Sequence, residues 1–104
     1  GGRPMIIRVL RITVREGRVE DFKRHISETA LPRVRSQPGL VTINVGLPRP
    51  DAPNTFCIVM TWDSIASLKA FAGEDWEQPR IMDGEEDIVV RREIEHYDTF
   101  GLMT

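Results

Sequence analysis

The sequence is poor in cysteine, in histidine and in long apolar runs, and each shortage excludes a class of protein. A single cysteine, Cys57, excludes an intrachain disulfide, and its apolar neighbours predict a buried, reduced thiol. A membrane span needs about 18 consecutive apolar residues, and no run approaches that length, so we expect no membrane partner. The amino terminus also lacks the pattern of a secretory signal, which favours a cytoplasmic protein.

Charge of one sign and metal-binding motifs are lacking too. The 104 residues carry a net charge of −2, with 40% apolar and 29% charged residues. That balance is typical of an ordinary globular domain and predicts no nucleic-acid partner. The two histidines, His25 and His96, lie far apart in the chain, and the cysteine has no second cysteine to join it. We therefore expect no metal site.

Hydrophobic periodicity predicts both strands and helices. Alternating or β-branched apolar runs predict strands at residues 5–14, 40–47, 55–62 and 88–100. Apolar residues spaced three and four apart predict a first helix over residues 19–35, with a kink or break near Ala30 because Pro32 falls inside it. A second helix is expected to begin at Asp63 as its N-cap and to end at Gly73.

The segments between these elements predict loops. Residues 48–54 are rich in proline, and the acidic residues 83–87 are expected to be solvated. We expect one domain over residues 5–100, with residues 1–4 as a tag remnant or N-terminal tail and residues 101–104 as a C-terminal tail.

The predicted element order is βαββαβ, which is the ferredoxin-like arrangement. Such an α+β domain has an antiparallel four-stranded sheet with two helices on one face. The first strand is apolar on both faces, since Ile7 and Val9 alternate with Ile6 and Leu10. Because the helices cover only one face, we expect a second copy of the chain to cover the other and form a homodimer.

Several segments of the sequence carry a resemblance to a known family. They are MIIRVLRITVREGRVEDF at residues 5–22, QPGL at 37–40, VMTWDSIASLKAFAGEDWE at 59–77 and IEHYD at 94–98. Together they resemble the antibiotic biosynthesis monooxygenase (ABM) family of dimeric α+β barrels. The resemblance implies a pocket between the sheet and the helices of each subunit. It also implies one of two activities: oxidation of a phenolic or anthrone-type aromatic to a quinone without a cofactor, or the binding and opening of haem.

The haem-degrading branch of that family has an Asn on the first strand, a Trp in the second helix and an iron-ligating His ten residues after that Trp. In this chain the first strand has no Asn, Phe71 stands at the position of the Trp, and Ile81 stands at that of the His. The resemblance therefore implies a reaction without a cofactor, with His25 or His96 as candidate iron ligands if haem binds. The acidic segment 83–87 is expected to disfavour anionic ligands such as haem propionates.

A cofactor-free oxygenase needs a base for the substrate proton, donors for the developing oxyanion and an apolar pocket. The candidate catalytic residues are the possible bases His96 and His25, and Arg80 as oxyanion donor. The candidate substrate-binding residues are Trp76, Trp62, Asn44, Tyr97 and Phe71. Alternative interpretations place Trp62 in the core, His96 at a dimer interface and Tyr97 on the face opposite His96. A module that binds a small ligand without catalysis is the third functional hypothesis.

Overall fold

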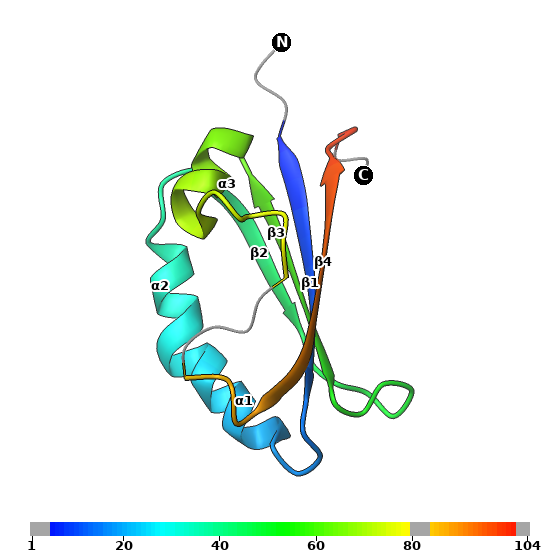
Figure 1. Ribbon diagram of the computed structural model, residues 1–104. Coiled ribbons are helices and arrows are strands. Elements are labelled where there is room, and N and C mark those ends of the chain that lie inside the picture. The colour runs from blue at the N-terminus through cyan, green and yellow to red at the C-terminus, as the bar shows by residue number, and fades with distance from the viewer. Residues whose placement is uncertain (1–4, 80–83, 102–104) are drawn as a thin grey trace.

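The protein is an antiparallel sheet with its helices packed on one face (Figure 1). The computed structural model describes residues 5–79 and 84–101. The strands are β1 (Ile6–Val14), β2 (Leu40–Gly46), β3 (Thr55–Trp62) and β4 (Val89–Asp98), arranged in the order β2-β3-β1-β4. The helical segments are α1 (Val19–His25), η1 (Ile26–Ala30), α2 (Leu31–Arg35) and α3 (Ile65–Ala72). The predicted ferredoxin-like α+β fold is confirmed.

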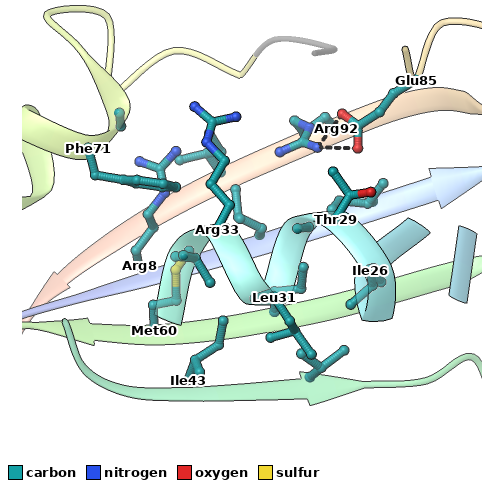
Figure 2. A pocket seen from close by; sticks show the side chains of 18 of the residues that line it. Arg8, Ile26, Thr29, Leu31, Arg33, Ile43, Met60, Phe71, Glu85 and Arg92 are labelled. Atoms are coloured by element: carbon teal, nitrogen blue, oxygen red, sulfur yellow. Dashed lines mark hydrogen bonds and ion pairs between the residues drawn. The ribbon is translucent and has the colours of Figure 1, made fainter. Parts of the chain in front are cut away.

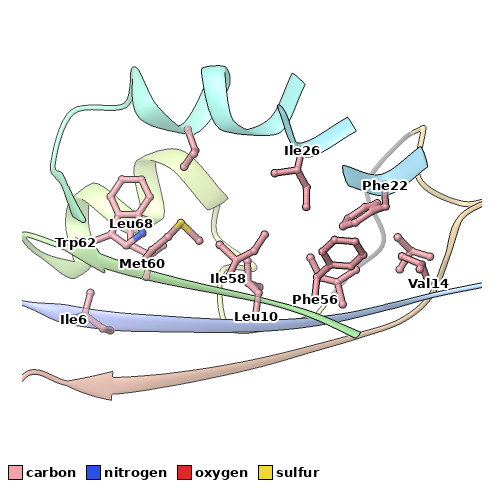
Figure 3. Packing of buried hydrophobic residues seen from close by; sticks show 13 residues of the cluster. Ile6, Leu10, Val14, Phe22, Ile26, Phe56, Ile58, Met60, Trp62 and Leu68 are labelled. Carbon is pink, nitrogen blue, oxygen red and sulfur yellow. The ribbon is translucent and has the colours of Figure 1, made fainter. Parts of the chain in front are cut away.

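Strand register decides which side chains reach the helical layer. On β1, Leu10 pairs with Ile58 of β3 and with Ile94 of β4. Side chains alternate across a strand, so the even-numbered residues of β1 all face the helices. The resulting core is drawn in Figure 3 and consists of Ile6, Leu10, Ile12, Val14, Phe22, Ile26, Val34, Phe56, Ile58, Met60, Trp62, Leu68 and Val89.

The first helix continues through Pro32 instead of breaking near Ala30. Segment η1 is π-helical, and the Leu31 N–H donates to the carbonyl of Ile26, five residues earlier. Pro32 then falls in the first turn of α2, where its missing N–H costs no α-helical hydrogen bond. The predicted break is therefore wrong, because a wider turn absorbs the proline while the backbone stays helical.

The second helix begins one residue later than predicted. Ser64 has extended backbone angles (φ −163°, ψ 162°), and its Oγ accepts a hydrogen bond from the Ser67 N–H at 3.1 Å. Ser64, not Asp63, is therefore the N-cap, and sequence alone could not separate two good capping residues in a row. Gly73 ends the helix as expected, with a φ of +93° that favours glycine.

The sheet face away from the helices also carries apolar side chains on its central strands, as predicted, together with the charged Arg11 and Glu95. Ile7 and Val9 of β1 and Val59 of β3 are half-buried there, although no helix covers them. Cys57 lies on this face and is half-buried, whereas the sequence predicted a buried thiol. None of the helices in residues 5–79 and 84–101 is long and apolar enough to cross a membrane.

Candidate functional site

A cavity of about 590 Å³ lies between the helical layer and the inner face of the sheet (Figure 2). Its volume is within the range of ordinary small-molecule sites. Apolar side chains from every layer form most of its wall. They include Leu10, Ile26, Leu31, Ile43, Val45, Ile58, Met60, Phe71 and Ile94. The cavity is thus suited to a small ligand with an apolar body.

Arg8 brings a positive charge into this wall. It lies on the inner face of β1 opposite His96 of β4, and it is only 7% exposed. Its Nη1 donates to the Trp76 carbonyl at 2.8 Å and lies 3.1 Å from His96 Nε2. Burial, followed by the charge of Arg92, lowers the pKa of Arg8 to about 10. Arg8 nevertheless stays charged at neutral pH.

A cluster of Arg92, Glu85 and His25 brings together β4, the loop before it and the end of α1. Arg92 of β4 donates from Nη2 to the Glu85 carboxylate, at 2.9 Å to Oε1 and 3.3 Å to Oε2 (Figure 2). Glu85 Oε2 also lies 3.4 Å from Nε2 of His25, which follows Arg24 at the end of α1. Burial lowers the pKa of Arg92, and the Glu85 charge and hydrogen bond oppose that shift. His25, Glu85 and Arg92 all line the cavity.

Glu85 corrects one expectation from the sequence. The acidic segment was expected to be solvated, yet Glu85 is 4% exposed and its carboxylate points to Arg92 and His25. Its neighbours Glu86 and Asp87 are exposed, as predicted. The segment therefore presents one buried carboxylate to the cavity, and this carboxylate is held by a cation.

His96 and Trp76 support the Arg8 end of the cavity. Trp76 lines the cavity and meets the His96 ring in an edge contact, with centroids 4.6 Å apart. His96 itself is not among the lining residues, so it lies behind Arg8 and Trp76. Burial, followed by the charge of Arg8, lowers the pKa of His96, with a weaker opposing effect from Glu77. A neutral His96 can accept the hydrogen bond from Arg8.

Phe71 forms a second aromatic wall. It lines the cavity, and its ring stacks on Trp62 with centroids 5.2 Å apart. Arg33 of α2 also lines the cavity and places its Cζ 5.7 Å from the centre of the Phe71 ring. Trp62 has no exposed surface and is not a lining residue, so it supports Phe71 from the core.

The remaining predicted residues lie elsewhere. Asn44 pairs with Val59 and is exposed on the outer face of the sheet, away from the cavity. Tyr97 is 49% exposed on the same outer face, where its hydroxyl donates to Glu95 at 2.6 Å and its pKa is raised by that bond. Tyr97 and His96 point to opposite faces of the sheet, as expected for neighbouring residues on one strand. Arg80 lies outside the described residues.

Among the cavity residues that sequence reasoning missed, Arg8, Arg92 and Glu85 matter most for the charge of the site. Arg8 carried a usable signal, since it falls between Ile6 and Leu10 on an apolar strand face. Arg92 lies two residues before Ile94, so its side chain points to the same strand face. A charge on that apolar face was the same kind of signal. Glu85 carried none, because nothing in an acidic loop distinguishes the one side chain that turns inward.

This arrangement can do acid–base chemistry on an aromatic ligand. The imidazole of His25 faces the cavity next to a carboxylate, and arginines provide positive charge beside apolar and aromatic walls. Among the residues that the structure describes, no three histidine, cysteine or acidic side chains are grouped to hold a metal ion.

A ferredoxin-like domain with a ligand cavity between sheet and helices defines the class of this protein. Residues 5–75 match the family model described as antibiotic biosynthesis monooxygenase, and the chain belongs to this ABM family. No curated protein sequence matches the chain.

Solved structures share the fold at low sequence identity. A protein of Shewanella oneidensis is 19% identical, with a TM-score of 0.76 over 92% of this chain and 91% of that one. A proposed antibiotic biosynthesis monooxygenase of Bordetella bronchiseptica is 18% identical, with a TM-score of 0.68 over 92% and 97%. A heme-degrading protein of Mycobacterium tuberculosis is 14% identical, with a TM-score of 0.70 over 99% of both chains.

Proposed function

We propose that this protein is a monooxygenase that oxidises a small phenolic or anthrone-type aromatic to a quinone without a metal or organic cofactor. One observation carries the proposal: an apolar cavity of about 590 Å³ contains a histidine beside a buried carboxylate, in a chain of the ABM family. A substrate that can itself reduce oxygen needs from the protein a base, a shaped pocket and charge to stabilise its anion.

His25 is the proposed base. Unlike His96, it lines the cavity, and Glu85 holds its Nε2 side through a 3.4 Å contact. A carboxylate beside an imidazole orients the ring and stabilises the imidazolium that forms when the ring takes a proton. Arg92 shares Glu85 with His25 and holds that carboxylate beside the ring, while Arg33 on the cavity wall supplies positive charge for the substrate anion. The role proposed for Arg80 stays a prediction.

The reaction balances without a further reductant. His25 removes a proton from the activated carbon or hydroxyl of the substrate, and the resulting anion gives electrons to O₂. For an anthrone, the ring CH₂ and O₂ become a carbonyl and water, with one oxygen atom entering each product. Trp76 and Phe71 provide flat walls for the aromatic rings of the substrate.

Oxygen uptake by metal-stripped protein with a panel of anthrones, naphthols and hydroquinones tests this proposal. We expect uptake above the buffer rate, and a loss of about 10²-fold or more in His25→Gln. Arg24→Gln is the matched control, because Arg24 is adjacent in the chain and its side chain is 65% exposed. Equal uptake by His25→Gln and the parent protein would remove His25 from the mechanism. No uptake across the panel would refute the oxygenase assignment.

A haem-dependent activity is the alternative, supported by the fold likeness to the heme-degrading protein. It predicts a strong Soret band when hemin is added to the protein and decay of that band under a reductant. We expect neither, because the cavity histidine is engaged by Glu85 and the Arg8 end has no imidazole on its wall. A His25→Gln-sensitive Soret band would favour the haem assignment instead.

We also propose that the protein is a homodimer that pairs through the outer face of the sheet. Its support is the half-buried apolar surface of Ile7, Val9 and Val59, which no helix covers. Sedimentation equilibrium of Val9→Glu should then report monomers at concentrations where the parent is dimeric. Ile65→Glu, an exposed position on α3 at the other face, should stay dimeric. A monomeric parent protein would contradict this proposal.

A further inference from the structure

Arg8 is a buried cation that no carboxylate neutralises within residues 5–79 and 84–101. Its hydrogen-bond partners are the Trp76 carbonyl and the His96 ring, which are both uncharged when His96 is neutral. Its Nε is fully covered and has no partner. Burying a charge without an opposite charge is costly, so an isolated arginine in a cavity wall points to a ligand that supplies the missing charge.

The structural role of Arg8 uses only part of its guanidinium. Nη1 alone ties the turn at Trp76 to the sheet, and its two N–H groups account for both recorded contacts. Nε and Nη2 make no hydrogen bond to any described residue. These contacts need N–H donors but not a positive charge, so the turn does not explain why this position carries a charge.

The other charges around the cavity do not cancel that of Arg8. Arg92 already has Glu85 as its partner, and Arg33 adds positive charge from α2. The one other acidic lining residue among those described is Asp75, which is exposed. The cavity wall therefore carries more positive than negative charge, and the uncompensated cation at its buried end is Arg8.

We propose that the cavity selects an aromatic acid, whose carboxylate binds Arg8 while its ring lies against Trp76 and Phe71. This inference rests on the proposed function in one respect, which is that a small aromatic occupies this cavity. Arginine suits a carboxylate because its guanidinium stays charged at neutral pH, and the Nη2 N–H groups of Arg8 make no hydrogen bond to any described residue. A ligand with a single negative charge would balance the single uncompensated positive charge of Arg8. The expectation that acidic residues 83–87 disfavour anions stays a prediction, and the proposal departs from it because the Glu85 carboxylate is already paired with Arg92.

Isothermal titration with 2-naphthoate and with its neutral isostere 2-naphthamide tests the inference in the intact protein. We expect the parent to bind the carboxylate about tenfold to a hundredfold more tightly than the amide. Arg8→Gln should remove that preference while keeping amide binding, and Arg8→Lys should retain part of it. Arg24→Gln removes an exposed arginine and should leave the preference unchanged.

Equal binding of 2-naphthoate and 2-naphthamide by the parent overturns the inference, and this comparison needs no variant to fold. An unchanged preference in folded Arg8→Gln overturns it as well. A carboxylate preference that depends on Arg8, combined with no oxygen uptake, supports the anion site and refutes only the oxygenase. Oxygen uptake on neutral phenols with no carboxylate preference supports the oxygenase and refutes only the anion site.

Discussion

Arg8 Nη1 lies 3.1 Å from His96 Nε2, so a guanidinium on β1 and an imidazole on β4 share one hydrogen bond across the strand pair. Guanidinium can only donate, so His96 must be neutral at Nε2 to accept. The anion site proposed at Arg8 would thus depend on the charge state of His96, which does not line the cavity. His96 is a positioning residue for Arg8.

This relationship predicts a dependence of stability on pH. Burial and Arg8 lower the folded-state pKa of His96 below its ordinary value of 6.5, and the nearby Glu77 opposes this only weakly. The unfolded chain therefore binds the proton more readily, so the contribution of His96 to stability is full above pH 6.5 and is lost as the pH falls from 6.5 through the lower folded-state pKa. Urea unfolding at about pH 7.5 and about pH 5.5 should show a smaller decrease for His96→Gln than for the parent. An identical decrease in both proteins would contradict this account.

Glu85→Gln should destabilise the protein strongly. The substitution leaves Arg92 buried without its carboxylate and removes the partner of His25, which should cost about 3 kcal/mol in free energy of unfolding. Glu86→Gln, at the exposed neighbouring position, should change it by less than about 0.5 kcal/mol. Adding Arg92→Met to Glu85→Gln should recover much of the loss, since the unpaired charge is then gone. If the double variant instead lost as much unfolding free energy as the two single variants together, Glu85 and Arg92 would not stabilise the protein as a charge pair.

Gly39→Ala should be more harmful than Gly17→Ala, although both glycines have positive φ angles (+91° and +84°). At Gly17 a Cβ meets nothing within 4 Å, so the cost is backbone strain of about 1 kcal/mol. At Gly39 a Cβ would collide with the side chain of Ser67 and lie 2.8 Å from Asp63 Oδ1. Chemical denaturation should give Gly39→Ala a loss at least about twofold larger. Equal losses of unfolding free energy in the two variants would mean that the start of α3 can shift to accommodate the added Cβ at little cost.

Ser64→Ala should cost about 1 kcal/mol, because it removes the hydrogen bond to the Ser67 N–H at the start of α3. Asp63→Ala, which leaves that bond in place, should cost clearly less. Thermal unfolding of the two variants measures the difference directly. The opposite ranking would restore Asp63 as the cap that the sequence suggested.

The sequence by itself determined the fold class and the alternation of side chains along the regular parts of the strands. Alternation along β1 and β4 is a local property of extended backbone, so it placed His96 and Tyr97 on opposite faces, but it could not say which face the helices cover. The same alternation puts Arg8 on the strand face of Ile6 and Leu10, a signal that the sequence interpretation did not use. Strand alternation also indicated that both faces of the sheet are apolar.

Only the tertiary structure decided which of these inward residues meet in one cavity. His25 reaches it from α1 and Glu85 from a loop, while His96 is screened by Arg8 and Trp76. Periodicity fixes the direction of a side chain within its own element, but the distance between elements depends on how they pack. For the same reason, the inward turn of Glu85 toward Arg92 could not be derived from an acidic loop.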